Sequence, residues 1–492
     1  MIQKSDLRVY NTLSGQKETF VPINDNRVGM YVCGPTVYGE AHLGHARGAI
    51  TFDIVYRVLQ YLGYNVRYVR NFTDVGHLVA DSDDGDDKVE KKAIAEQKEP
   101  QEVAQYYETK YLWAVDSLNC LRPNLMPIAS GHIIEQIEVV KTLLDKGLAY
   151  ESEGSVYFDV EKYNSTVKKY GILSHRTLED TMENSRQLSG QSEKRNPYDF
   201  ALWKKAPKEH IMKWPSPWSL GFPGWHLECT AMGRKYLGET FDIHGGGMDL
   251  IFPHHDCEIA QSYGAYGTLP AKYWLHNNMI TIEGRKMGKS YNNFITITEM
   301  FNGKHPLLKQ AYSPMTIRFF MLMAHYRSTL DFSNDALIAA EKGLNRLFEA
   351  KSKIPTLPES ESSSFDVNKI MQDAFEAVCD DFNTPVMIAQ LFEMCKHINS
   401  VADKKETITK QDKELLIQLF DDAVDKILGL KEESVSENTH IVNGLMDLIM
   451  SMRADVRAKK DYATSDKIRD NLQVLGIEIK DSKEGATWRI TK

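Results

Sequence analysis

Two short segments far apart in the chain carry side chains that could handle phosphate. The first, HLGH at positions 42–45, places two imidazoles about one helical turn apart. The second, KMGKS at positions 286–290, places two lysines on a loop that contains a glycine. Imidazole N–H groups can donate to phosphate oxygens, and cations that arrive late stabilise charge that develops only in a transition state. We therefore expect attack on ATP at its α-phosphate.

The residues around the first segment predict a strand, a loop and the start of a helix. Residues 28–32 are apolar, and apolar side chains recur at helical spacing from Ala46 to Leu62 before Gly63 closes the run. A helix N-terminus offers free N–H groups and a positive dipole end to phosphate, and Gly44 lets a nucleotide approach the backbone. Each segment alone is weak evidence, because histidine pairs often cap or fill a core and lysine loops are often only solvated.

Both segments together, in this order, resemble the signature motifs of class I aminoacyl-tRNA synthetases. The resemblance implies an α/β fold, a Rossmann-type doubly wound parallel sheet with an insertion, so that the motifs come from the two halves of one sheet. Residue 288 is Gly where the class pattern has Ser, which removes a hydroxyl but keeps both lysines.

Cysteine, histidine and carboxylate residues offer a second kind of chemistry. Cys33 follows the first predicted strand, and Cys229 comes between the two phosphate segments. A helix that starts near Pro253 would place His254 and Glu258 on one face, at i and i+4. Two thiolates, an imidazole and a carboxylate form a plausible tetrahedral zinc site. The alternative is that both cysteines are small buried hydrophobic residues, as most free cysteines are.

Two neighbours of these residues stay open as alternative ligands. Cys257 is three residues from His254 and could approach the same face. His255 would share a face with Glu258 at i and i+3. Spacing alone does not choose among them.

Several segments around these residues resemble the cysteinyl-tRNA synthetase family. They are CGPTVY at 33–38, WHLEC at 225–229, HGGG at 244–247 and the HH pair at 254–255. The resemblance implies one zinc ion per chain that binds the thiol of the substrate cysteine. By the same resemblance, the zinc ligands are Cys33, Cys229, His254 and Glu258.

The remaining site residues fall into three groups. We expect charge stabilisation during catalysis from His42, His45, Lys286 and Lys289. We expect ATP to be bound by Gly44, Gly246, Asp249 and Lys289, with the glycines giving adenosine access to the backbone and the aspartate holding ribose hydroxyls. The resemblance implies contacts to the substrate cysteine from Thr73 and Trp225, although Trp225 could equally be an ordinary core tryptophan.

A metal gives such a site a way to tell cysteine from serine. The two amino acids differ by one atom, and a pocket built on shape separates near-isosteres only ~10–200-fold. Zinc lowers the pKa of a thiol until it binds as thiolate, whereas an alcohol stays protonated. We therefore expect no second, editing site.

Length and composition predict several domains. The chain has 492 residues, is 42% hydrophobic and contains no apolar run of bilayer length. We expect a catalytic domain over residues 1–300, with the insertion at about 123–222. By resemblance, a helical stem-contact region at 301–355, a helical bundle at 366–430 and a small α+β anticodon-binding domain at 440–492 follow.

Charge does not exclude a nucleic-acid partner. The net charge is −9, but from Ser451 onward there are ten Lys and Arg against seven Asp and Glu. The expected partners are tRNA(Cys), L-cysteine and ATP with Mg2+, with no membrane. Six cysteines without a CxxC pair, and an N-terminus without an apolar core, favour a cytoplasmic protein, which we expect to be a monomer.

Three other functions share part of this pattern. A cysteine ligase that acts on a small amine would use the same adenylate but lack the C-terminal domain. A non-catalytic tRNA-binding relative would not need intact phosphate segments. A simple adenylyltransferase would share HxGH but need neither the metal residues nor an anticodon-binding domain.

Overall fold

The structure is a computed structural model that describes residues 4–78, 85–178, 180, 193–433, 437–459, 461–482 and 485–490. The chain forms two compact units, Met1–Lys431 and Glu432–Lys492. None of the described helices combines the length and the apolar character needed to cross a bilayer.

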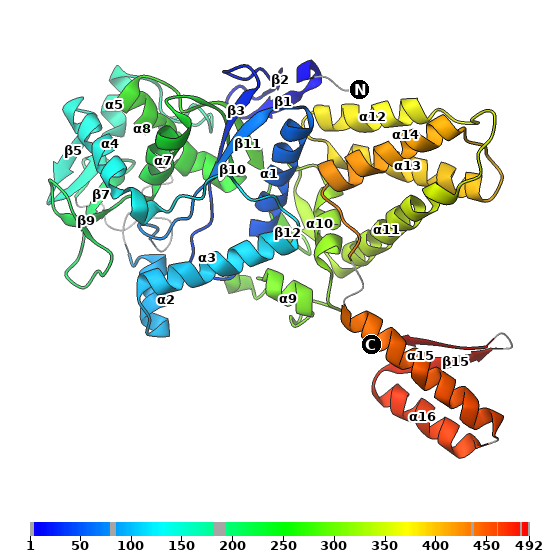
Figure 1. Cartoon of the computed structure of the whole chain (residues 1–492). Coiled ribbons are helices and arrows are strands. Elements are labelled where there is room, and N and C mark those ends of the chain that lie inside the picture. Colours follow the sequence, from blue (N-terminus) through cyan, green and yellow to red (C-terminus); the bar gives the residue numbers. More distant parts are fainter. Residues whose placement is uncertain are drawn as a thin grey trace. The chain divides into compact units, whose positions relative to one another are not determined.

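A four-stranded parallel sheet lies at the centre of the first unit (Figure 1). Its order is β11-β10-β3-β4, with bounds β3 Arg27–Val32, β4 Asn65–Arg70, β10 Phe241–Gly247 and β11 Ala271–Asn277. The chain leaves β3 for β4 on one side, and β10 leads to β11 on the other. The order therefore reverses between β3 and β10, and ligands of open α/β sheets bind at the carboxyl ends of the strands at such a point.

Helices cover both faces of this sheet. Met30 and Val32 of β3 pack into the same core as helix α1 (Leu43–Tyr61), whereas Tyr31 packs with residues of helix α7 (Glu228–Leu237). Alternate residues of a strand point to opposite faces, so an almost fully apolar strand is what a doubly covered sheet requires. The predicted strand, loop and helix around the first phosphate segment are confirmed.

A second, antiparallel sheet lies between the two halves of the parallel sheet in sequence. Its order is β5-β6-β7-β9-β8, with bounds β5 Ala149–Ser152, β6 Ser155–Phe158, β7 Phe200–Lys205, β8 Trp214–Pro215 and β9 Leu220–Pro223. Helices α4 (Ile133–Asp145) and α5 (Val160–Thr166) accompany it. The sheet has its own hydrophobic core, which α8 (Asp256–Tyr266) shares.

Short elements surround the parallel sheet. The N-terminal hairpin is β1 (Arg8–Asn11) with β2 (Gln16–Thr19), and helices α2 (Lys88–Glu96) and α3 (Pro100–Ser117) follow β4. A small sheet of order β13-β12-β14 carries the second phosphate segment; its strands are β12 Ile280–Ile282, β13 Arg285–Lys286 and β14 Leu330–Phe332.

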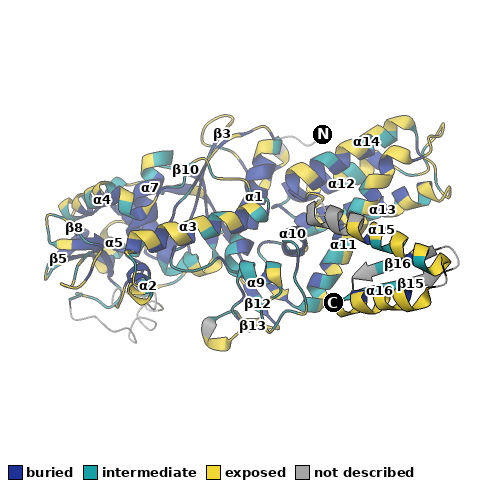
Figure 2. Ribbon diagram, turned by 60° about the horizontal axis from the view of Figure 1, so that its bottom comes forward, coloured by how far each residue is buried: buried dark blue, intermediate teal, exposed yellow. Residues whose placement is uncertain are grey.

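The rest of the first unit is helical. Its helices are α9 Ile297–Asn302, α10 Pro314–Leu322, α11 Asn334–Lys353, α12 Val367–Cys379, α13 Thr384–Ala402 and α14 Lys410–Phe420. In α11 the buried residues Leu337, Ala340, Leu344 and Leu347 recur every three or four positions, and Figure 2 shows helices with one buried and one exposed face.

The second unit contains two helices and a hairpin. Helix α15 (Glu437–Ala458) packs with α16 (Tyr462–Val474), and β15 (Ile477–Ser482) pairs antiparallel with β16 (Gly485–Ile490). The predicted α/β fold with an insertion, a helical region and a small α+β unit is confirmed. The finer division at residues 300, 355 and 366 stays a prediction.

Candidate active site

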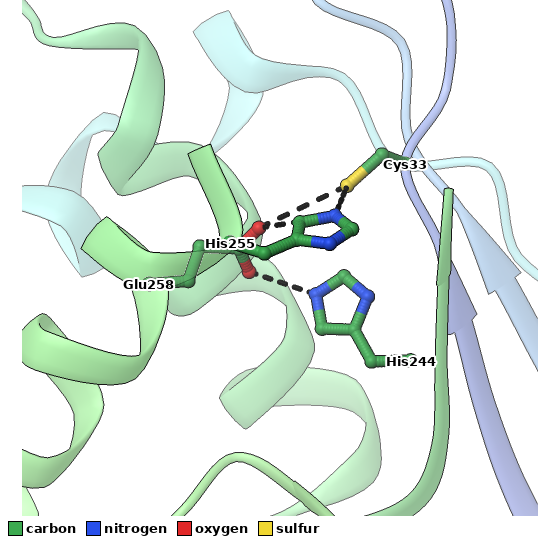
Figure 3. Close-up of side chains that lie close together, drawn as sticks. All are labelled: Cys33, His244, His255 and Glu258. Atoms are coloured by element: carbon green, nitrogen blue, oxygen red, sulfur yellow. Dashed lines mark hydrogen bonds and ion pairs between the residues drawn. The ribbon is translucent and has the colours of Figure 1, made fainter. Parts of the chain in front are cut away.

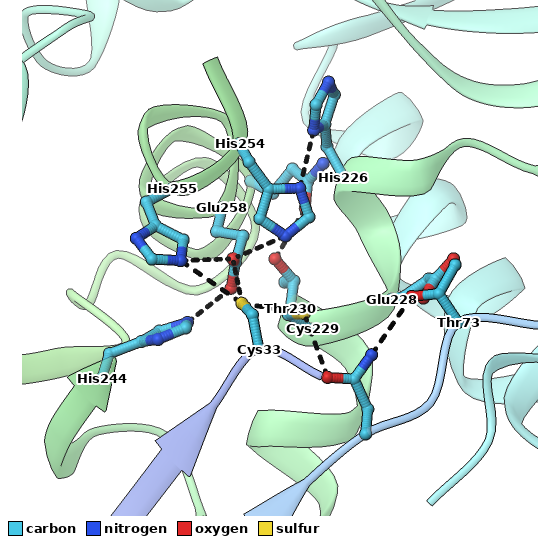
Figure 4. Close-up of polar contacts among 12 residues, drawn as sticks. Cys33, Thr73, His226, Glu228, Cys229, Thr230, His244, His254, His255 and Glu258 are labelled. Carbon is cyan, nitrogen blue, oxygen red and sulfur yellow. Dashed lines mark hydrogen bonds and ion pairs between the residues drawn. The ribbon is translucent and has the colours of Figure 1, made fainter. Parts of the chain in front are cut away.

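Four side chains proposed as metal ligands lie together in one buried cluster. The ligand atoms of Cys33, Cys229, His254 and Glu258 lie within 4.8 Å of one another. The two sulfurs are 3.5 Å apart, and Nε2 of His254 is 3.2 Å from Oε1 of Glu258. None of the four residues is more than 9% exposed. We call these four residues the donor set (Figure 4).

The fold brings the donor set together where the strand order reverses. Cys33 follows β3, and its N–H donates to the carbonyl of Gly245 in β10 at 3.0 Å. Cys229 lies in the first turn of α7, and Glu258 lies in the first turn of α8. His254 lies in the helical turn that leads into α8, four residues before Glu258. The i, i+4 placement that the sequence predicted is therefore present.

Other buried polar groups orient the donor set. Nε2 of His244 lies 2.8 Å from Oε2 of Glu258, and Nδ1 of His226 lies 2.9 Å from Nδ1 of His254. If Nε2 of His254 faces a metal, its Nδ1 carries the proton and donates to His226. Partners of this kind fix the tautomer and the ring orientation of a ligand.

A second group of possible ligands overlaps the donor set. Cys33, His244, His255 and Glu258 also have ligand atoms within 4.8 Å of one another (Figure 3). Nε2 of His255 is 3.3 Å from the sulfur of Cys33. Cys257 belongs to neither group, because it packs in the core of the antiparallel sheet with its sulfur 3.3 Å from the hydroxyl of Tyr170.

Burial and mutual charge perturb the titration of the donor set. Burial, with the carboxylates of Glu258 and Glu228, raises the pKa of Cys33 to about 11, and burial raises the pKa of Cys229 well above its ordinary value. Burial acts against the charged forms of His254 and Glu258, but their neighbours overcome it: Cys229 and Glu258 raise the pKa of His254, and His244 and His254 lower that of Glu258. Without a cation, the cluster holds protonated thiols beside an ion pair.

The chemistry of the donor set fits a zinc ion. Zinc takes sulfur, nitrogen and oxygen ligands in tetrahedral sites, and two thiols, one imidazole and one carboxylate supply four. The two buried thiols are otherwise costly to ionise, and a divalent cation would remove that cost.

The two predicted substrate-contacting residues line the same region. The ring of Trp225 lies 4.6 Å from the ring of His254, measured between centroids, and stacks on the ring of His77 at 3.9 Å. The hydroxyl of Thr73 donates to Oε2 of Glu228 at 2.7 Å. Glu228 directly precedes Cys229 in the chain. Trp225 therefore contacts the donor set through His254, while Thr73 is held by the start of α7.

The two histidines of the first phosphate segment lie side by side. Their ring centroids are 3.8 Å apart, and His42 caps α1, with its Nδ1 accepting from the N–H of Gly44 at 3.1 Å. Neutral His42 therefore carries its proton on Nε2. Burial, which disfavours the charged form, lowers the pKa of His45 well below its ordinary value, so His45 is neutral too.

Gly44 leaves room for the His42 ring and lies near the second phosphate segment. A Cβ at this position would lie 2.9 Å from the His42 ring and 3.6 Å from Cε of Met287. Lys286 ends the two-residue strand β13 and is exposed. The backbone of Lys289 begins a short helical turn, and its side chain lies outside the described part of the chain.

The predicted adenosine contacts lie at the end of β10. A Cβ on Gly246 would lie 2.9 Å from the ring of His255, so this glycine is also needed for packing. Asp249 is exposed in the turn that follows the strand. Both residues thus lie at the carboxyl end of the parallel sheet, where a nucleotide is expected.

Three residues of this region are not predicted from the sequence. His244 is expected only as part of a glycine run, and no role is expected for His77 or Asn71. Asn71 holds the backbone next to Cys33: its Oδ1 accepts a hydrogen bond from the N–H of Gly34 at 2.9 Å. Spacing carries no signal for these contacts, since each joins segments that are distant in sequence.

Comparison with known families and sequences gives one consistent result. The family described as tRNA synthetases class I (C) catalytic domain matches residues 19–342, and the DALR domain matches residues 375–431. A cysteine–tRNA ligase of Phocaeicola vulgatus is 59% identical over 493 residues, covering 99% of this chain and 100% of the relative. One of Porphyromonas gingivalis is 58% identical over 486 residues, covering 98% of this chain and 99% of the relative.

Solved structures agree on the fold. A methionyl-tRNA synthetase of Mycobacterium tuberculosis in complex with methionyl-adenylate superposes with a TM-score of 0.56 at 13% identity, covering 82% of this chain and 89% of that one. At this identity the likeness concerns architecture alone. The sequence matches, which span nearly the whole chain, show that it belongs to the cysteine–tRNA ligase family of the class I aminoacyl-tRNA synthetases.

Proposed function

We propose that the chain activates L-cysteine with ATP and transfers it to the 3′ end of tRNA(Cys). In the first step a carboxylate oxygen of cysteine attacks the α-phosphorus of magnesium-bound ATP, and the bond to pyrophosphate breaks. In the second, the terminal ribose hydroxyl attacks the cysteinyl carbonyl, and AMP leaves. The observation that carries this proposal is the buried donor set at the switch point of the nucleotide-binding sheet.

The donor set would hold one zinc ion, and this accounts for the choice of substrate. Bound there, zinc would lower the pKa of a substrate thiol from about 8.5, so that cysteine binds as thiolate while serine does not. His244 and His226 keep Glu258 and His254 oriented for that role through their contacts of 2.8 and 2.9 Å. Trp225 would wall the pocket beside His254, and Thr73, three residues beyond the end of β4, would face the substrate cysteine.

The phosphate end works by hydrogen bonds and charge. Because Nδ1 of His42 accepts from Gly44, its Nε2–H is the group that donates to an α-phosphate oxygen. His45 is kept neutral by burial and acts as a hydrogen-bond donor rather than as a cation. Lys286 and Lys289 supply positive charge to the crowded phosphate and the leaving pyrophosphate. No side chain is required as a nucleophile, because positioning and electrostatics suffice.

The nucleoside and the RNA would occupy other surfaces. Gly44 and Gly246 let the nucleotide approach the backbone, and the exposed carboxylate of Asp249 would bind ribose hydroxyls. The C-terminal unit, residues 432–492, would bind the anticodon end of the tRNA.

Amino-acid-dependent ATP–pyrophosphate exchange, aminoacylation of total tRNA and metal analysis test the proposal together. We expect exchange with cysteine alone, charging of tRNA(Cys) and one zinc per chain. Zinc-free protein with full cysteine-dependent exchange, or charging by serine as readily as by cysteine, would overturn it. Exchange with cysteine but transfer to a small amine, and not to tRNA, would indicate the amine-ligase alternative.

A further inference from the structure

The side chain of Asn293 bonds the backbone of the second phosphate segment at two points. The N–H of Gly288 donates to Oδ1 of Asn293 at 2.8 Å, and Nδ2 of Asn293 donates to the carbonyl of Lys286 at 3.1 Å. The residue is 7% exposed, although the segment it holds is largely exposed. We call residues 285–290 the lysine loop. Beyond the pairing of its first two residues with β12, the backbone of the loop is therefore held by a buried amide.

The orientation of this amide follows from its partners. A backbone N–H can only donate, so the oxygen of Asn293 must face Gly288. A carbonyl can only accept, so the nitrogen must face Lys286. An amide side chain satisfies both partners at once, whereas a carboxylate at the same position would face the Lys286 carbonyl with a second acceptor.

The residues that follow Asn293 are fixed to the first phosphate segment. The N–H of Ile297 donates to the carbonyl of Ala41 at 2.8 Å, and the N–H of Leu43 donates to the carbonyl of Ile295 at 3.3 Å. Directly after Asn293, the ring of Phe294 packs edge-on against the ring of His42, with centroids 4.8 Å apart. Asn293 therefore lies between the lysine loop and residues 294–297, which contact the segment that carries the two histidines.

We propose that Asn293 is a positioning residue that sets the lysine loop relative to His42, and through it the approach of the lysines to the phosphates. This inference rests on the proposed function. Asn293 touches no reacting atom; it acts through the backbone of Lys286 and Gly288. We call the two hydrogen bonds from Asn293 to Gly288 and Lys286 the clamp. Because the lysines act on charge that develops in the transition state, loss of the clamp lowers the rate of cysteine activation and leaves cysteine binding unchanged.

Pyrophosphate exchange by the full chain tests this positioning role. Asn293→Ala removes both contacts, and Asn293→Asp keeps an acceptor for Gly288 but loses the donor to Lys286. We expect kcat for cysteine-dependent exchange to fall roughly 10- to 100-fold in the alanine variant, with the KM for cysteine and the zinc content unchanged. The aspartate variant should also fall below the wild type, because its second oxygen would face the Lys286 carbonyl. Asn302→Ala, which removes an exposed amide at the end of α9, is the matched control and should keep wild-type kcat.

Limited trypsin digestion tests the same clamp without relying on activity. Trypsin cuts after lysine and arginine, and the loop contains Arg285, Lys286 and Lys289. Loss of two hydrogen bonds should speed cleavage within the loop roughly tenfold in Asn293→Ala, without faster cleavage elsewhere. If the wild-type chain lacked cysteine-dependent exchange, the proposed function would be overturned. The digestion result would still show whether Asn293 holds the loop.

The positioning role would be overturned by an unchanged kcat in both Asn293 variants, by a loss that appears in the KM for cysteine instead of kcat, or by loop cleavage at the wild-type rate. Faster cleavage throughout the chain would also contradict it, because that result indicates a general loss of stability.

Discussion

The donor set and the lysine loop differ in how the chain supports them. The donor set is buried, and its residues come from a strand end and the starts of two helices that meet in one core. The lysine loop is largely exposed and begins with a strand of two residues. Buried polar neighbours hold the donor set, while the loop is held by the pairing of β13 with β12, by the Asn293 amide and by the partly buried Met287.

This difference matches what each region has to do in the proposed reaction. Discrimination of a thiol from an alcohol happens on binding, so the groups that make it must be in position beforehand. Stabilisation of the leaving pyrophosphate is needed only in the transition state, so the lysines can be carried by a segment that moves. Changes in the two regions should therefore affect different kinetic constants.

The largest effect is expected from Cys229→Ser. The hydroxyl of serine is a poor zinc ligand, so the variant should lose bound zinc and with it cysteine-dependent exchange. Metal analysis and exchange assays of the same preparation measure both. Removal of zinc from the wild type with a chelator should have the same effect, and added zinc should restore activity.

Cys257→Ser is the matched control for that substitution. Cys257 is also buried and lies one residue before Glu258, but its sulfur contacts Tyr170 rather than the donor set. It should keep its zinc and its activity. If Cys257→Ser loses zinc and Cys229→Ser keeps it, the donor set has been assigned wrongly.

Lys286→Ala should have the next largest effect, on the other side of the comparison. Removal of a group that stabilises transition-state charge typically costs about 100- to 1,000-fold in kcat. The KM for cysteine and the zinc content should not change, because the lysine loop takes no part in metal binding. Lys304→Ala, at another exposed lysine, is the control. A rise in the KM for cysteine in Lys286→Ala would contradict the separation of the two regions.

His244→Asn tests whether the donor set depends on its buried neighbours. The imidazole lies 2.8 Å from Oε2 of Glu258 and stacks on Trp274. Its loss should weaken zinc binding about 10- to 100-fold, as is usual for residues that orient a metal ligand. Titration with a competing chelator measures this affinity. Equal affinity in variant and wild type would mean that Glu258 is oriented by other contacts.

Local patterns predicted the elements well. The apolar spacing between Ala46 and Leu62 predicted helix α1 within a few residues, because that pattern records which face of the helix is buried. The i, i+4 spacing of His254 and Glu258 predicted a shared face for the same reason. Both predictions depend only on neighbouring residues and on helix geometry.

Contacts between distant segments could not be predicted in this way. Cys33 and Cys229 are 196 residues apart, and only the strand order of the sheet brings their sulfurs together. Family resemblance supplied that pair. It supplied nothing for His77, whose stacking on Trp225 depends on the path of the chain after β4, or for Asn293, whose amide reaches back to the lysine loop.

Gly288→Ser should have the smallest effect on kcat. It tests whether glycine at this position affects the conformation of the lysine loop. A Cβ at this position would lie 3.2 Å from Cδ2 of Tyr291. Tyr291 is 63% exposed, so its side chain can shift. The N–H of residue 288 still donates to Asn293, so the clamp survives the substitution. We expect kcat for exchange to change by less than about threefold, which corresponds to roughly 0.7 kcal/mol in the barrier. A much larger change in kcat, at constant KM for cysteine, would show that glycine at this position sets the conformation of the loop, and that Asn293 alone does not.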